Sequence, residues 1–386
     1  MPITYRSRRL EAFLTGFSDT EIGPAGGLIA HKVAKRWRDQ IRDPSFLWNE
    51  MCSSGIHLEM TIETPVTVRI AVYDQYDRRH EVAIRAGVAG LERHREVRID
   101  SRGDFRISPE GDSGILRPAA CTALTVSPEC GQPTPCTIYL PHTCIAEIVD
   151  ITSHAPVRPA SYAGERLRWT HYGSSISQGV LVKDPTRRWT EQVARRLDLS
   201  LRDFSISGNA QMDPGVARAI AAVPADVITC AIGINLVNSD SMRERCFIPA
   251  LHGFIDVIRE RLPATPIVLI TACSCPIQED VPGPTFMNEH GVFVAARRHV
   301  DNDAGALTLR RTRELVAQVV RGRKDANLSV VDGRTLLGPN DTRFLADNLH
   351  PDEEGTDLIA ARAGAMLLSL LRSKGYDIAD RGTATS

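Results

Sequence analysis

The sequence lacks the features that would indicate a membrane or nucleic-acid environment. No apolar run reaches the roughly 20 residues that a membrane-spanning helix needs. The opening stretch MPITYRSRRLEAFLTG has basic residues but no apolar core and no small-residue cleavage site. The net charge is only −1, so no overall field attracts nucleic acid or anionic lipid. These absences predict a soluble, cytoplasmic protein that binds neither partner, and they leave the oligomeric state open.

Motifs for nucleotides and metals are also missing. The sequence has no dinucleotide fingerprint, no P-loop and no HExxH motif. Its nine cysteines include no CxxC pair. Cys121, Cys130, Cys136 and Cys144 lie fairly close together, but structural zinc sites usually pair their ligands about two to four residues apart. We therefore expect free thiols, most of them buried, and a protein that needs no cofactor and no metal.

What is present divides into two halves, and the first has the period of a strand. In GIHLEMTI (55–62) and VTVRIAVY (66–73) apolar and polar residues largely alternate, and similar short runs recur up to residue 151. Gly, Pro, Asp and Ser separate these runs and supply turn geometry. Residues 1–152 are therefore predicted to be a β-sandwich or jelly roll. Its lead-in, including AHKVAKRWRDQI (30–41), is expected to be helical or irregular.

A linker rich in Pro, Ala and Ser (153–165) precedes a region with a different pattern. In residues 166–375 strand-like runs alternate with helical stretches, which predicts a parallel sheet with helices on both faces. The strand-like runs are LRWTHY, LRDFSI, DVITCAI, PIVLITA and LSVVDG, and the helices are expected near 187–197, 213–222, 241–261, 307–321 and 351–373. Residues 376–386 are predicted to be a polar tail.

Short motifs with glycine and polar residues follow three of these strands, and a fourth precedes the last helix. They are GSS (173–175), SGN (207–209), GIN (233–235) and DNLHP (347–351). In such sheets, functional sites gather at the carboxyl ends of the strands. If the strands are neighbours, the four motifs therefore converge on one edge.

Together these residues have the groups that acyl transfer to serine needs. A serine hydroxyl such as that of Ser175 is a poor nucleophile until a base, usually histidine, takes its proton. Asp347, three residues before His350, can orient that imidazole. The tetrahedral intermediate needs donors for its oxyanion, and the backbone N–H of Gly208 and the amide of Asn235 are candidates. Taken singly, each of these residues would more often be a cap, a turn or a loop residue.

The ordered set Ser175, Gly208, Asn235 and His350 resembles the SGNH (GDSL-type) hydrolases. YGSSIS, ISGNA, GIN and DNLH match the four blocks of that family, over roughly residues 165–375. The resemblance implies a flavodoxin-like, three-layer α/β/α domain. It also implies Ser175 as nucleophile, His350 as base and then acid, and Asp347 as orienting carboxylate. The N–H groups of Ser175 and Gly208, with Asn235, would form the oxyanion hole. The layout with an N-terminal β-rich domain also looks like that of certain bacterial carbohydrate esterases.

Two positions depart from the family pattern. The first block usually has aspartate where this chain has Ser174, and the third usually has a second polar residue where this chain has Leu236. Ser174 is thus an alternative nucleophile. The position of Ser175 relative to Gly173 and to the following Ile176 favours Ser175 instead. The pattern also differs from the Gly-x-Ser-x-Gly elbow of α/β-hydrolases.

Ser174, His171 and Asp213 are candidate substrate-binding residues. For each there is a simpler interpretation: helix capping for Ser174 and Asp213, and a structural strand histidine for His171. The long stretch 276–304 follows a strand end and has the length of a lid or substrate-selecting loop. His142, in the β-rich half, is a further and weaker candidate.

The sequence therefore predicts a serine esterase that hydrolyses a carboxylic ester through an acyl-serine. The substrate we expect is a short acyl group on a sugar or another polyol. Acyl transfer is an open alternative because the same acyl-enzyme serves both reactions. A catalytically inactive protein that binds glycan or protein is a second alternative. A lipase is a third, disfavoured by the aromatic share of only 5%.

Overall fold

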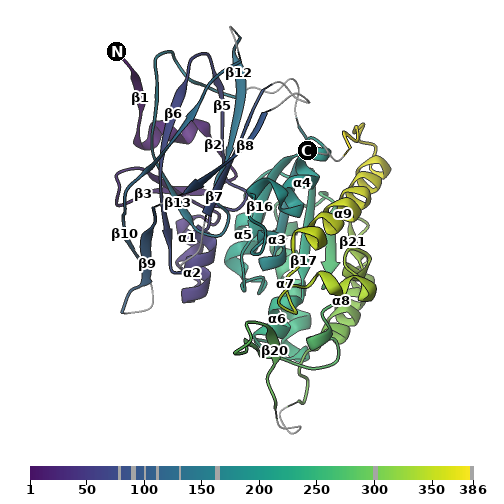
Figure 1. The fold of residues 1–386 in the computed structure, drawn as a ribbon. Coiled ribbons are helices and arrows are strands. Elements are labelled where there is room, and N and C mark those ends of the chain that lie inside the picture. The colour runs from purple at the N-terminus through teal and green to yellow at the C-terminus, as the bar shows by residue number, and fades with distance from the viewer. Residues whose placement is uncertain are drawn as a thin grey trace. The chain divides into compact units, whose positions relative to one another are not determined.

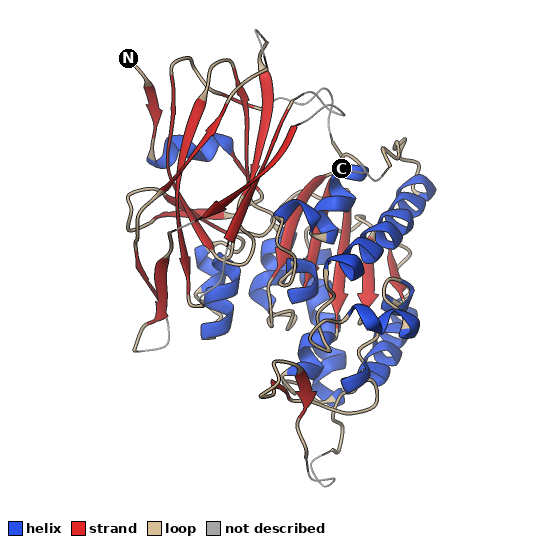
Figure 2. Cartoon of the chain, in the orientation of Figure 1, coloured by secondary structure: helices blue, strands red, loops and turns tan. Residues whose placement is uncertain are grey.

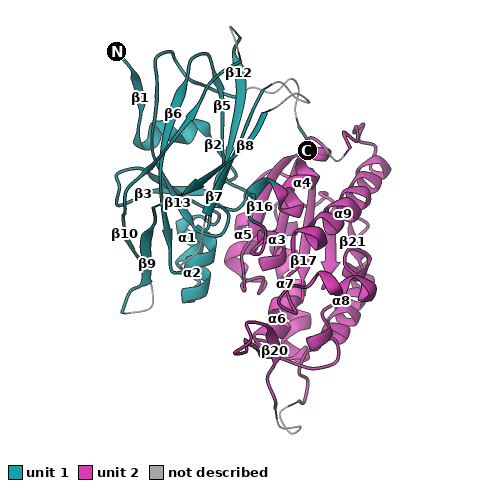
Figure 3. Ribbon diagram, viewed as in Figure 1, with its two compact units in different colours: residues 1–166, 183–186 teal, residues 167–182, 187–386 magenta. Residues whose placement is uncertain are grey.

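The computed structural model describes residues 1–76, 80–87, 93–99, 101–109, 113–129, 132–160, 166–298 and 303–382 (Figure 1). The chain forms two compact units (Figure 3). The first comprises Met1–Arg166 with Lys183–Thr186, and the second comprises Leu167–Val182 with Arg187–Ser386. Cys130, residues 161–165 of the expected linker and residues 383–386 of the expected tail lie outside the described residues.

The described strands of the first unit form two mainly antiparallel sheets (Figure 2). The larger contains β1 (Ile3–Tyr5), β3 (Asp19–Ile22), β4 (Leu28–His31), β6 (Val66–Asp74), β9 (Gly103–Ile107), β10 (Gly114–Arg117), β11 (Thr122–Val126) and β13 (Ile145–Ser153). The smaller contains β2 (Leu14–Thr15), β5 (His57–Ile62), β7 (His80–Ala86), β8 (Arg93–Ile99), β12 (Thr134–Tyr139) and β14 (Arg158–Pro159). The path through the larger sheet is β10-β9-β6-β13-β4-β3, and through the smaller β14-β5-β12-β7-β8.

Alternating apolar residues from the two sheets share one core. Val66, Val68 and Ile70 of β6 lie in the same buried cluster as Leu58 and Met60 of β5. Successive side chains of a strand point to opposite faces, so the period of two in the sequence places these residues inward. The predicted β-sandwich is confirmed.

The lead-in to the sandwich differs in part from expectation. Residues 28–31 form β4, and the segment 30–41 becomes helical only for one turn, α1 (Lys35–Arg38), before α2 (Pro44–Met51). Ile29 pairs with Glu147 of β13, and His31 is buried with its Nδ1 2.6 Å from Glu50 Oε1. These contacts with distant parts of the chain favour an extended backbone here over a longer helix.

The second unit is built on five parallel strands in the order β16-β15-β17-β18-β21. They are β15 (Arg168–Gly173), β16 (Ser200–Ser205), β17 (Val227–Ile232), β18 (Ile267–Thr271) and β21 (Leu328–Val331). The helices are α3 (Ser175–Gln178), α4 (Trp189–Arg196), α5 (Pro214–Ala221), α6 (Ile234–Asn238), α7 (Glu244–Arg259), α8 (Leu309–Arg323) and α9 (Glu353–Ser373). Each predicted strand is present, and this order is that of the flavodoxin-like sheet.

Helices cover both faces of this parallel sheet (Figure 1). On one face, Trp169 of β15 packs in a cluster with Trp189 of α4 and Ile359 of α9. On the other face, the Tyr172 ring of β15 lies 5.1 Å from the ring of Phe254 in α7. Since strand side chains alternate between faces, the sheet is the middle layer of three. None of the helices that the structure describes is long and apolar enough to cross a bilayer.

The predicted lid region contains a small hairpin. After β18 the chain forms a short 3-10 turn, η3 (Pro276–Gln278), and then two antiparallel strands, β19 (Thr285–Met287) and β20 (Phe293–Ala295). Residues 299–302 of this region lie outside the described residues. The hairpin, labelled at β20 in Figure 1, lies beyond the carboxyl ends of the parallel strands.

Candidate active site

Ser175 lies where strand β15 changes directly into helix α3. Ser174 is the N-cap of this helix, and its hydroxyl accepts a hydrogen bond from the Ile176 N–H at 3.3 Å. Gly173 ends the strand, and a side-chain carbon there would lie 2.4 Å from Ser177 Oγ and 2.7 Å from His171 Nε2. Only glycine fits this turn, which presents Ser175 at the edge of the sheet.

Ser175, His350 and Asp347 form one chain of hydrogen bonds. Ser175 Oγ lies 2.8 Å from His350 Nε2, and His350 Nδ1 lies 2.7 Å from Asp347 Oδ2. Asp347 Oδ1 also accepts from the backbone N–H groups of Leu349 and His350, at 3.0 and 2.6 Å. Burial raises the pKa of Asp347, but the hydrogen bonds and the charge of His350 outweigh it and lower that pKa below 3.8. The carboxylate is therefore charged at neutral pH and can hold the imidazole in one orientation.

The loop that contains His350 returns from the far edge of the sheet. Strand β21 lies at that edge, and the 3-10 segments Gly333–Thr335 and Pro339–Phe344 lead back to Asp347. Asn348 has φ +70°, a left-handed conformation that allows the tight turn between Asp347 and His350. The Asp352 side chain then caps α9 by accepting from the Gly355 N–H at 2.8 Å.

Gly208 and Asn235 follow the strands on either side of β15. Gly208 has φ +71°, which glycine adopts without strain. Asn235 Oδ1 accepts from the Ala210 N–H at 3.0 Å, which fixes the amide and leaves its NH₂ group to point elsewhere. Among the described residues, none accepts a hydrogen bond from the backbone N–H of Ser175 or Gly208. These three groups remain available as donors.

Buried charged and polar residues hold helix α3, which begins with Ser175, in place. Arg188 donates from Nε to the Gln178 carbonyl at 3.0 Å and from Nη2 to the Ser177 carbonyl at 3.1 Å. Arg188 also forms an ion pair with Asp203 of β16, and both side chains are fully buried. The Gln178 side chain in turn accepts a hydrogen bond from the Ser207 N–H. The sequence analysis missed these supports, because nothing in their spacing marks them as partners.

The remaining candidate residues, His171, Asp213 and His142, are not part of the hydrogen-bonded set of serine, histidine and aspartate. His171 is fully buried, with Nδ1 2.7 Å from Thr229 Oγ1 and Nε2 2.9 Å from Ser177 Oγ, so both ring nitrogens are occupied inside the protein. Burial lowers the pKa of His171 to about 4 and keeps it neutral. Asp213 is the half-buried N-cap residue of α5, without a side-chain capping bond. His142 is buried in the first unit.

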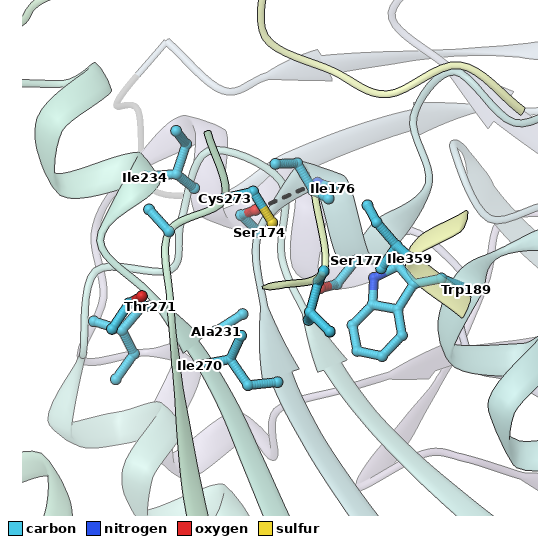
Figure 4. A pocket seen from close by; sticks show the side chains of 13 residues that line it. Ser174, Ile176, Ser177, Trp189, Ala231, Ile234, Ile270, Thr271, Cys273 and Ile359 are labelled. Carbon is cyan, nitrogen blue, oxygen red and sulfur yellow. Dashed lines mark hydrogen bonds between the residues drawn. The ribbon is translucent and has the colours of Figure 1, made fainter. Parts of the chain in front are cut away.

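An apolar pocket lies beside the nucleophile turn (Figure 4). Ser174 and Ile176, the residues on either side of Ser175, line it, and so does Ile234, which precedes Asn235. Much of the remaining wall is apolar and comes from Trp189, Ala231, Ile270, Cys273, Leu336 and Ile359. The cavity measures about 40 Å³. Since a buried water occupies about 10–15 Å³ by this measure, the space fits only a few heavy atoms.

The fold and these contacts define a class of protein. A parallel α/β sheet with a hydrogen-bonded serine, histidine and aspartate at its carboxyl edge is the arrangement of a serine hydrolase. Residues 171–358 match the model of the GDSL-like Lipase/Acylhydrolase family. This region therefore belongs to that family, and the chain is a serine ester hydrolase that acts by acyl ester hydrolysis or acyl transfer. No curated protein matches the chain in sequence.

Solved structures share the architecture over both units. A salicylyl-acyltransferase from a tetracycline biosynthetic pathway matches with a TM-score of 0.75 and 20% identity, covering 96% of this chain and 98% of that one. A putative GDSL-like lipase from Bacteroides ovatus matches with a TM-score of 0.69 and 18% identity, covering 99% and 100%. A family two carbohydrate esterase from Cellvibrio japonicus matches with a TM-score of 0.58 and 10% identity, covering 96% and 99%. At these identities the likeness establishes the fold.

Proposed function

We propose that this protein cleaves a carboxylic ester through an acyl-serine on Ser175. The Ser175 oxygen attacks the acyl carbon as its proton passes to His350 Nε2. The bond to the alcohol then breaks, and His350 returns that proton to the leaving oxygen. Water repeats the sequence on the acyl-enzyme and releases the acid. The observation that carries the proposal is the 2.8 Å contact between Ser175 Oγ and His350 Nε2, with Asp347 2.7 Å behind the imidazole.

The oxyanion of the tetrahedral intermediate would be held by the N–H groups of Ser175 and Gly208 and by the Asn235 amide. Support comes from the absence of other acceptors for the two N–H groups within the described part of the chain and from the fixed Asn235 amide oxygen. Preorganised donors of this kind commonly contribute about 100-fold or more to kcat.

The acyl group would be short. The pocket beside Ser175 is small and mostly apolar, and the polar atoms that line it are occupied by protein partners: Thr271 Oγ1 accepts from the Gly333 N–H, and Ser177 Oγ contacts His171. A mostly apolar site of about 40 Å³ fits an acetyl or similarly small group better than a long chain. The similarity in fold to a carbohydrate esterase supports a sugar or another polyol as the alcohol.

Acyl transfer is the second candidate reaction. The structural match with a salicylyl-acyltransferase extends over both units of this chain, and this match supports acyl transfer as an alternative to hydrolysis. Transfer differs from hydrolysis only in the nucleophile that attacks the acyl-enzyme, so an alcohol must compete with water at His350. The partition of product between free acid and a new ester measures which reaction prevails.

The first test is intact-mass analysis after treatment with a fluorophosphonate, together with p-nitrophenyl acetate turnover. We expect one label on the wild type and none on Ser175→Ala, with turnover lost in parallel. Ser174→Ala is the matched control, because it removes the neighbouring hydroxyl and should still be labelled. A label that persists in Ser175→Ala but disappears in Ser174→Ala would move the nucleophile to Ser174. An unlabelled wild type would overturn the proposal.

A further inference from the structure

The hairpin formed by β19 and β20 is fastened to the loop that contains Asp347 and His350. The Phe293 N–H donates to the Asp347 carbonyl at 2.9 Å, and the Phe293 carbonyl accepts from Asn348 Nδ2 at 3.3 Å. The Phe293 ring meets the His350 imidazole edge to face, with centroids 5.4 Å apart and planes at 73°. One residue of the hairpin therefore makes three contacts with this loop.

The register of the hairpin identifies a second residue on the same face. Phe293 pairs directly with Met287, whereas Phe286 pairs with Val294. Directly paired residues of an antiparallel ribbon point to the same side, and successive residues point to opposite sides. Met287 thus shares the face of Phe293, while Phe286 lies on the other face. Met287 is 54% exposed and Phe286 is 52% exposed.

The place of Phe293 beside His350 decides which part of an ester it can meet. In the proposed reaction His350 gives its proton to the leaving alcohol, and later activates the water or alcohol that attacks the acyl-enzyme. The alcohol portion must therefore lie next to the imidazole. A group that packs against the side of that imidazole borders the space for the alcohol.

We propose that Phe293 and Met287 form an apolar strip that binds the alcohol portion of the ester and selects an alcohol whose ring has an apolar face. Sugars and aryl alcohols share this property, since each can lay a flat C–H or π surface on an aromatic side chain. This proposal rests on the proposed function of Ser175 and His350. It adds that the hairpin determines which alcohol the enzyme accepts.

The test compares acetate esters that differ only in the alcohol: methyl acetate, phenyl acetate and a mono-acetylated methyl glucoside. In Phe293→Leu and Met287→Ala we expect kcat/KM to fall about three- to tenfold for the esters of ring alcohols, the size of effect that one aromatic or apolar contact gives. For methyl acetate it should change by less than about twofold, because methanol is too small to reach the strip. Loss on the glucoside alone would identify a sugar site, and loss on phenyl acetate alone an aryl site.

Phe286→Leu is the matched control, because it removes an equally exposed aromatic ring from the opposite face of the hairpin and should change none of the three rates. Fluorophosphonate labelling of each variant separates the two levels of the proposal. If Ser175 is labelled and the strip variants lose activity equally on all three esters, or on none, the strip does not bind the alcohol. If the wild type is not labelled, the proposed function itself fails.

Discussion

The side-chain oxygen of Gln178 accepts a hydrogen bond of 2.8 Å from the backbone N–H of Ser207. Gln178 ends the helix that begins with Ser175, and Ser207 immediately precedes Gly208. One buried amide therefore connects the nucleophile to the loop with a candidate oxyanion donor. This bond helps to set the distance between the attacking Ser175 oxygen and the Gly208 N–H. Small displacements at such sites lower the reaction rate.

Replacing Gln178 with Met tests that connection, since methionine has a similar volume and no acceptor for the Ser207 N–H. We expect kcat with p-nitrophenyl acetate to fall about tenfold or more, with KM changed much less, because the lost alignment matters most in the transition state. Gln192→Met, on helix α4, loses hydrogen bonds to Arg187 and Asp357 and serves as the control for general loosening. Equal losses in both variants would contradict a specific role for Gln178.

Asp347→Asn should lower kcat far more than it lowers stability. The carboxylate accepts from His350 Nδ1, so Nε2 is free to take the Ser175 proton. An amide can place an NH₂ group at that position, which favours the opposite tautomer and blocks Nε2 as a base. A loss of about 10²–10⁴ in kcat is expected from such a tautomer change.

Asp352→Asn is the control for Asp347→Asn, because asparagine is an equally good N-cap and this residue lies just outside the hydrogen-bonded set. Its turnover should stay within about twofold of the wild type while its helix cap remains. An Asp347→Asn enzyme with turnover as high as that of Asp352→Asn would remove Asp347 from the mechanism.

His171 makes the second unit sensitive to acid. Its pKa is lowered, chiefly by burial, to about 4, whereas an unfolded histidine titrates near 6.5. Between these values the unfolded chain binds more protons than the folded one, so stability falls as the pH drops from about 6.5 to about 4. The contribution is about 3 kcal/mol across that window.

His171→Gln keeps a polar side chain without a titrating ring and should flatten this part of the profile. Urea unfolding at pH 7, 5.5 and 4.5 measures the difference, with His290→Gln at the exposed hairpin turn as the control. The free energy of unfolding should fall more steeply with acid in the wild type than in His171→Gln. Parallel profiles would show that His171 is not buried in its neutral form.

The core of the candidate site was predictable because each of its parts follows a local pattern. A period of two marks the strands, a period near 3.6 marks the helices, and the motifs around Ser175, Gly208, Asn235 and His350 follow strand ends or precede a helix. Parallel strands bring their carboxyl ends to one edge, so local patterns were enough to predict that these residues lie at the same edge of the sheet. The family match over residues 171–358 confirms the class of enzyme that those motifs predicted.

The supports of the site could not be predicted in the same way. Phe293 reaches His350, and Arg188 reaches Asp203, through packing that depends on where whole elements lie. From the sequence alone, a phenylalanine in a long loop, such as Phe293, or an arginine before a helix, such as Arg188, could have many different roles. The same holds for the lead-in to the first unit, where Leu28 and Ile29 pair with the distant strand β13.

The Arg188–Asp203 ion pair gives the last prediction. Both side chains are fully buried, and Arg188 also holds the Ser177 and Gln178 carbonyls. Arg188→Met removes the cation from two buried carboxylates, that of Asp203 and that of Glu191, whose Oε1 lies 3.3 Å from Arg188 Nη1, and an uncompensated buried charge typically costs about 3–5 kcal/mol. Adding Asp203→Leu removes one of these two charges and should recover part of the stability even though Ser205 loses this acceptor, because an apolar pair can replace a buried ion pair. Activity should not recover with it, since the double variant still lacks the donors to the two carbonyls of the nucleophile helix. Chemical denaturation and p-nitrophenyl acetate turnover on both variants separate the two effects, and a double variant that regains stability and turnover together would show that Arg188 acts on stability alone.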